Sequence, residues 1–100
     1  MANNLPEQPH NTNKFYGFSN AVLWYMKEKG MTQSELVESS RLSKTTISRI
    51  VRNNNDKGSS YQPTPPVIMA VGIGLKLTYR EYEELIYAAY PEMEYMKEHF

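Results

Sequence analysis

Two Thr-x-x-Glu boxes constrain the fold of this 100-residue chain more than any other feature. TQSE occupies residues 32–35 and TYRE occupies residues 78–81, and each is followed by apolar residues with helical spacing. In such a box the Thr hydroxyl accepts a hydrogen bond from the backbone amide of the Glu, and the Glu carboxylate accepts one from the backbone amide of the Thr. Each box therefore predicts the first turn of a helix, the second and the fifth along the chain.

The first and third helices are predicted from other start and stop signals. Ser19 is expected to cap a helix that runs to about Lys29 and ends at Gly30, because glycine readily adopts the left-handed conformation of a helix end. Ser43 is expected to cap the third helix, whose two isoleucines lie three residues apart on one face. The buried contacts expected from these two segments are Val22, Tyr25, Met26, Met31, Ile47 and Ile50, with Trp24 less certain.

Prolines and an apolar run predict the fourth helix. Pro65 and Pro66 suit a first turn capped by Thr64, and the run VIMAVGI leads to an end at Gly72 or Gly74. No strand precedes these glycines and no GK[ST] follows them, so helix packing and capping explain them better than a phosphate loop does. Because this helix is apolar nearly all round, we expect it to be the central one.

The remaining segments complete an all-α organisation. The turn-rich stretch 53–64 reads as a loop, and residues 1–17 read as a disordered polar leader. Residues 18–90 form one domain of five helices, and residues 91–100 form a short tail helix after a break at Pro91. The apolar stripe expected on the fifth helix consists of Tyr82, Leu85, Ile86 and Ala89.

Composition excludes several classes of function. Without Cys the chain has no disulfide, thiolate metal site or thiol nucleophile, which fits a reducing cytoplasm. His10 and His99 lie near the two ends without metal-ligand spacing, so we expect no enzyme, no metal and no cofactor. The longest apolar runs, 21–26 and 67–73, are far shorter than the roughly 20 residues that span a bilayer. The expectation is a cytoplasmic protein with no membrane partner and no small-molecule ligand.

Charge is unevenly distributed along a chain whose net charge is zero. Residues 41–57 contain five basic side chains and one acidic side chain, whereas residues 78–100 contain two basic and six acidic ones. Such a chain could present a basic face to phosphates while its acidic end stays in solvent or meets a partner. Charge alone favours an ordinary solvated surface, so it does not establish a nucleic-acid partner.

The segment 32–51 has the features of a helix-turn-helix DNA reader. Such a reader needs a buried seam between two helices, a tight turn, and a second helix with short polar or basic side chains on its exposed face. No acidic residue occurs from Leu42 to Asn55, where a carboxylate would repel phosphate. The seam is expected from Leu36, Val37, Leu42, Ile47 and Ile50, and the exposed face from Lys44, Thr45, Ser48 and Arg49.

A family resemblance rests on two stretches of the chain. The run KEKGMTQSELVESSRLSKTTISRI resembles the phage repressor and Cro type of helix-turn-helix domain, also called the XRE family. The run IGLKLTYREYEELI is similar to the junction between the fourth and fifth helices of that family. The resemblance covers roughly residues 18–90. It implies a five-helix, repressor-like domain that binds duplex DNA through a reading helix at about 44–52 and regulates transcription.

The resemblance also implies roles for individual side chains. Arg or Lys suits the two acceptors of guanine, and the methyl group of Thr suits that of thymine. The base-contacting residues implied are Lys44, Thr45, Thr46, Ser48 and Arg49. The phosphate-contacting residues implied are Gln33, Ser43, Arg52 and Asn53. The alternative is that Thr45, Thr46 and Ser48 are plain surface polar residues and that Arg49 is exposed to solvent, in contact with Glu38 or with nothing.

Three positions depart from the family pattern. Arg41 stands at the turn where the family usually has Gly, so either the turn accepts a non-Gly residue with positive φ or it has a different shape. Val37 replaces a small Ala in the second helix, and Val51 adds an apolar contact near the end of the third. Asn53 is still suited to a left-handed cap after that helix.

Two further expectations concern partners. One reading helix covers few base pairs, so a homodimer that addresses two half-sites is expected, with its contact on the fifth helix and the tail. The alternative is a protein-interaction adaptor built on the same scaffold. The Tyr- and Met-rich end of the chain favours the adaptor, and the acid-free third helix favours DNA.

Overall fold

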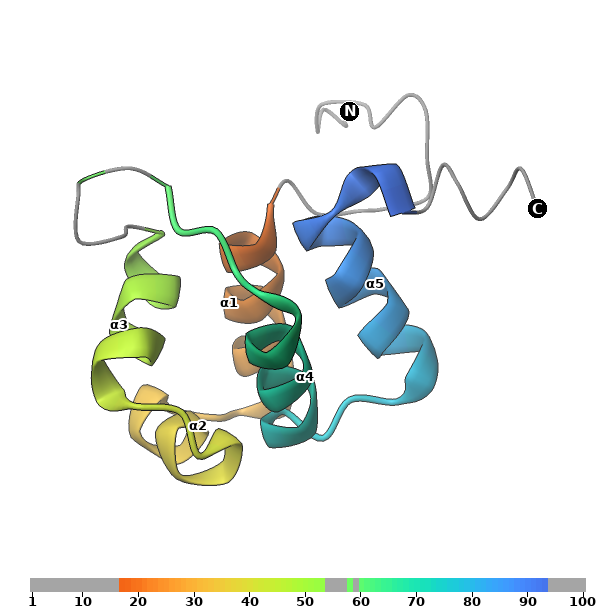
Figure 1. Ribbon diagram of the computed structural model, residues 1–100. Coiled ribbons are helices and arrows are strands. Elements are labelled where there is room, and N and C mark those ends of the chain that lie inside the picture. The colour runs from red at the N-terminus through yellow and green to blue at the C-terminus, as the bar shows by residue number, and fades with distance from the viewer. Residues whose placement is uncertain (1–16, 54–57, 59, 94–100) are drawn as a thin grey trace, which may run out of the picture.

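The computed structural model describes residues 17–53, 58 and 60–93, and within these ranges the regular structure is entirely helical (Figure 1). The predicted leader, apart from Gly17, and the tail from residue 94 onward lie outside the described residues. The five predicted helices are all present, and residues 91–93 are also helical. The helices are α1 (Phe18–Lys29), α2 (Gln33–Ser40), α3 (Lys44–Arg52), α4 (Pro65–Gly74) and α5 (Tyr79–Ala89).

Packing places α1 and α4 in the middle of the bundle. α1 contacts both α3 and α5, while α2 packs on α3 and most extensively on α4, which also contacts α5. In Figure 1, α3 lies at one side of the molecule and α5 at the other, with α1 and α4 between them. The buried hydrophobic residues are Phe18, Ala21, Val22, Tyr25, Met26, Leu36, Ile47, Ile50, Ile68, Val71, Leu75, Leu85 and Ala88.

Both capping boxes form as predicted. The Thr32 hydroxyl accepts from the Glu35 amide at 3.1 Å, and the Glu35 carboxylate accepts from the Thr32 amide at 2.8 Å. The Thr78 hydroxyl and the Glu81 carboxylate make the same pair of bonds, at 3.1 and 2.9 Å. Hydrogen bonds to the charged form hold the pKa of each carboxyl below its ordinary value, and Lys29 adds to the effect at Glu81.

Acid should therefore weaken the fold through these boxes. A carboxyl whose pKa is lowered by folding contributes stability above its unfolded-state pKa, about 4.3 for Glu, and loses it as pH falls through the lowered value. We expect Glu81→Gln to lower the free energy of unfolding at neutral pH and to flatten its decline in acid, measured by urea titrations at several pH values. Glu28→Gln, which alters an exposed carboxylate of α1, is the control. Equal pH profiles for the Glu81→Gln variant and the wild type would contradict this account.

The start of α1 differs from the prediction. Gly17, with φ of 99°, occupies the N-cap, so the helix begins at Phe18 rather than after Ser19, and no side chain caps it. The earlier start buries Phe18 against the core. Ser19 lies buried in the first turn, where its hydroxyl donates to the side-chain oxygen of Asn53 at 3.2 Å. Gly30 ends the helix in the left-handed conformation, with φ of 63°, as predicted.

The prediction that α4 is the central helix is only partly correct, because α4 lies between α2 and α5 but is not covered on all sides. Ile68 and Val71 are buried, but Met69 and Ile73 are 54% and 69% exposed. A helix that is apolar on all sides is buried only if other elements pack against every side. Among the described residues, only α2 and α5 pack extensively on α4. Thr64 holds the N-cap position without a side-chain bond, and prolines occupy the first two positions of the helix.

The two glycines of α4 serve helix packing. A Cβ at Gly72 would lie 2.6 Å from the ring of Tyr82, and one at Gly74 would lie 3.0 Å from the backbone of Ser40. The Ser39 hydroxyl also donates to the Gly74 carbonyl at 2.9 Å. The end of α4 is thus fixed directly against the end of α2.

Hydrogen bonds between residues far apart in the sequence fix the positions of α5 and of the segment before α4. The buried Tyr25 hydroxyl donates to the Glu84 carboxylate at 2.8 Å, linking α1 to α5. Burial, the bond to Glu84 and the nearby carboxylates raise the pKa of Tyr25 far above its ordinary value. The Tyr90 hydroxyl donates to the Pro63 carbonyl at 2.7 Å and secures the segment that leads into α4.

Candidate nucleic-acid interface

The candidate site consists of α2, the turn 41–43 and α3. Arg41 ends α2 in the left-handed conformation, with φ of 66°, so the turn accepts a non-Gly residue with positive φ, which costs about 1 kcal/mol. The Ser40 hydroxyl accepts a hydrogen bond from the Leu42 amide at 3.1 Å, which fixes the chain immediately after Arg41. These local bonds set the direction in which α3 leaves the turn.

Both ends of α3 are capped as predicted, the first by the Ser43 side chain and the last by the backbone of Asn53. The Ser43 hydroxyl accepts from the Thr46 amide at 3.0 Å, and Asn53 ends the helix in the left-handed conformation, with φ of 53°. Because the Ser19 hydroxyl donates to the Asn53 side chain, the end of α3 is also bound to the start of α1. Both ends of α3 are thus held in place, the first by the Ser43 cap and the last by the bond to α1.

The buried seam between α2 and α3 is aliphatic. Leu36, Ile47 and Ile50 are completely buried, and Val37, Leu42 and Val51 are partly buried against them. Val51, one of the departures from the family pattern, therefore packs against the core with part of its side chain. The seam fixes which side of α3 points away from the protein.

The outward side of α3 carries hydroxyl and cationic groups. Thr45, Ser48, Arg49 and Arg52 follow the spacing i, i+3, i+4, i+7 and share the face opposite the two buried isoleucines. Lys44, Thr45 and Arg52 are exposed, while Ser48 and Arg49 are half-buried. The Arg52 Nε atom donates to the Ser48 carbonyl at 3.4 Å, which lays this guanidinium along the helix. No carboxylate occurs in α3 or its two caps.

The other predicted site residues lie around this face. Gln33 is exposed at the first position of α2, and Ser43 and Asn53 are exposed at the two ends of α3. Thr46 is half-buried on the flank of α3, and its hydroxyl accepts from the Ser43 hydroxyl at 2.9 Å. The predicted residues are therefore gathered on α3, its two caps and the start of α2, with Thr46 already engaged in the cap.

Tyr61, in the loop before α4, packs on α1, and no sequence pattern predicts this position. Its ring stacks on Phe18 with centroids 6.5 Å apart. The positive charge of Arg49 opposes the rise that burial produces in the pKa of the Tyr61 hydroxyl. The packing of the loop on α1 gives this tyrosine its position.

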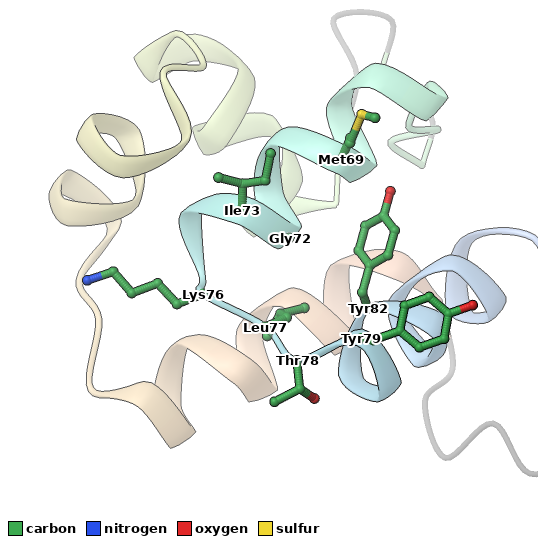
Figure 2. A pocket seen from close by; sticks show the side chains of 8 residues that line it. All are labelled: Met69, Gly72, Ile73, Lys76, Leu77, Thr78, Tyr79 and Tyr82. Carbon is green, nitrogen blue, oxygen red and sulfur yellow. The ribbon is translucent and has the colours of Figure 1, made fainter.

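Other kinds of site find little support in the part of the chain that the structure describes. There, no three His, Asp or Glu side chains lie close enough together to hold a metal ion. No helix in that part combines the length and the apolar character needed to cross a bilayer. A groove of about 350 Å³ lies between α4 and α5 (Figure 2), and a second hollow of about 450 Å³ lies where the end of α1 meets α2 and Lys76. Neither hollow is lined by a residue of α3.

Similarity to known proteins gives no independent assignment. Comparisons of the chain with protein-family models, with curated proteins and with solved structures found no significant match.

Proposed function

We propose that this protein binds duplex DNA with α3 in the major groove and acts as a sequence-specific, repressor-like transcriptional regulator in the cytoplasm. The observation that carries the proposal is the outward face of α3, which combines cations and hydroxyls without a carboxylate. An α-helix fits the major groove, where base edges present distinct patterns of donors and acceptors. A face of this chemistry therefore matches the groove in both shape and charge.

The position of each side chain suggests its role. Lys44 and Arg49 suit guanine, and the exposed methyl group of Thr45 suits thymine. Arg52, at the far end of the same face, suits a phosphate, as does Gln33 at the start of α2. Ser43 and Thr46 are committed to the cap through each other, so their contribution is to orient the first turn of α3, from which base contacts are made.

The test is selection of duplexes from a randomised pool by the purified protein, followed by titration of the selected duplex at several salt concentrations. We expect enrichment of a defined sequence and affinity that falls steeply with salt. Lys44→Ala and Arg49→Ala should each weaken binding by about tenfold to a hundredfold and relax specificity at one position. Arg80→Ala is the matched control, because it removes an exposed cation from α5 on the other side of the molecule (Figure 1).

The contrary result is equally clear. If no sequence is enriched and binding is absent even at low salt, α3 does not read DNA. An equal loss from Arg80→Ala would show that only the total charge matters. The adaptor function would then be favoured, and the observation that supports it is the apolar groove between α4 and α5.

A further inference from the structure

The turn between α2 and α3 holds its first residue in a conformation that the residue disfavours. Arg41 ends α2 with φ of 66°, in the left-handed region. A Cβ atom opposes this conformation, so glycine adopts it most readily, and Asn and Asp follow. Gly30 occupies the same region at the end of α1, and Asn53 does so at the end of α3. At the end of α2 a long cation stands instead, and backbone strain of this kind is concentrated at functional sites.

The Arg41 side chain makes no polar contact that would offset this strain. Its backbone amide donates to the Val37 carbonyl at 3.1 Å, a bond that glycine would make equally well. The residue is exposed, and its guanidinium forms no ion pair or hydrogen bond with any residue in the described ranges. The fold would therefore be more stable with glycine at this position, so the use of the arginine lies in something that the protein binds.

Arg41 lies in the same acid-free stretch as α3. No carboxylate occurs in residues 39–55, and Arg41 stands two residues before Ser43, the N-cap of α3. The bond between the Ser40 hydroxyl and the Leu42 amide fixes the backbone on both sides of Arg41. In Figure 1 this turn leads directly into the first turn of α3. The base of the arginine side chain therefore has a fixed place beside the start of α3.

A guanidinium in this position suits a phosphate better than a base. Its planar set of donors matches two oxygens of one phosphate, and it is charged at every physiological pH. Arg41 precedes the helix that would enter the groove, so it would meet the backbone of the duplex, not the base edges. A rise of 1.5 Å per residue separates Gln33 from Arg41 by about 12 Å along α2, so these two residues would contact different phosphates.

We propose that Arg41 is a phosphate anchor of the DNA-binding surface, held in the left-handed conformation at a cost to the stability of the fold. The proposal rests on the proposed function and adds a residue to it. The resembled family usually has Gly at this turn, so the anchor belongs to this chain and is not implied by the resemblance. With contacts at both ends of α2, the domain is less free to rotate on the duplex, which fixes the register in which α3 meets the bases.

The first experiment compares the stability of three variants of the full chain by thermal melting. Arg41→Gly should raise the melting temperature, because glycine removes the conflict between Cβ and backbone. Arg41→Gln and Arg41→Lys keep a side chain at the same φ, so both should melt close to the wild type. An Arg41→Gly protein that is less stable than the wild type would show that Arg41 supports the fold, and would overturn the proposal.

The second experiment titrates the selected duplex and an unrelated duplex at several salt concentrations. Arg41→Gly and Arg41→Gln should each weaken binding to both duplexes by about twofold to fivefold, the value of an exposed ion pair. Each should also reduce the slope of log affinity against log salt by about 0.9, the change expected when one phosphate contact is lost. Arg41→Lys keeps the charge and should keep the slope. Arg80→Ala, which removes an exposed cation from α5, is the control and should leave the slope unchanged.

The outcomes separate this proposal from the proposed function. Wild-type slopes for both Arg41→Gly and Arg41→Gln, in a protein that binds the selected duplex, overturn the anchor and leave the function standing. A loss confined to the selected duplex also overturns the anchor, because a phosphate contact acts on every sequence. A wild-type chain that binds no duplex even at low salt refutes the function and the anchor together. A shallower slope in a variant that is more stable than the wild type supports both.

Discussion

Replacing Ile47 by Ala should lower the free energy of unfolding by about 2–5 kcal/mol, because it leaves a cavity at the completely buried centre of the α2–α3 seam. Small domains are stable by only about 5–15 kcal/mol, so the loss is a large fraction of the total. Urea titration followed by circular dichroism measures it. DNA affinity should fall by more than the unfolded fraction explains, since Ile47 also fixes the side of α3 that faces outward.

Leu23→Ala provides the comparison for this substitution. It removes an aliphatic side chain of the same size from α1, at a position that is 40% exposed. We expect a cost below about 1 kcal/mol, as for most surface substitutions. Comparable losses from the two variants would show that Ile47 is not the centre of the seam.

Replacing Thr45 by Glu should weaken DNA binding by about tenfold to a hundredfold, or about 1.4–2.8 kcal/mol, while leaving the fold as stable as before or more so. The two effects have opposite signs for separate reasons. A carboxylate in the first turn of α3 interacts favourably with the helix dipole, by about 0.3–1 kcal/mol. The same carboxylate on an exposed, otherwise acid-free face repels phosphate and accepts no hydrogen bond from the acceptor edge of guanine.

Thr45→Gln distinguishes charge from size, because its side chain has the same length as Glu without the charge. We expect it to bind DNA more tightly than the Glu variant at low salt, with the gap narrowing as salt rises. Fluorescence anisotropy with the selected duplex and thermal melting of the free protein give the two readouts. Unchanged affinity in a stabilised Thr45→Glu protein would place the DNA surface elsewhere.

Features that depend on neighbouring residues were predictable from the sequence. The capping boxes at Thr32 and Thr78, the Ser43 cap and the glycine end of α1 form because their bonds join residues three to five positions apart. The sequence was compatible with two turns at Arg41, one with positive φ and one of a different shape. The spacing of the core residues of α2 and α3 required a turn at this point but did not select its conformation. Ser19 shows the limit of such reasoning, since a serine near a helix start is equally able to lie inside the first turn.

Features that depend on distant residues were not predictable. The apolar run of α4 has no side that its own sequence marks as outward, so the exposure of Met69 and Ile73 became visible only with the positions of α2 and α5. The position of Tyr61 depends on how a loop packs on α1. In the candidate site, the outward face of α3 could be predicted from helical spacing. The hydrogen bond that commits the Thr46 side chain to the Ser43 cap could not.

The close approach of Gly74 to Ser40 has a consequence for communication across the domain. Ser40 is the last residue of α2 and directly precedes the turn into α3, while Gly74 ends the helix that carries Met69 and Ile73. With backbone against backbone, α4 has no soft side chain to absorb a shift, so a displacement of α4 is transmitted to the turn. Any partner that prefers one position of α4 is therefore thermodynamically linked to the orientation of α3, and whatever α3 binds must alter the affinity for that partner by the same factor.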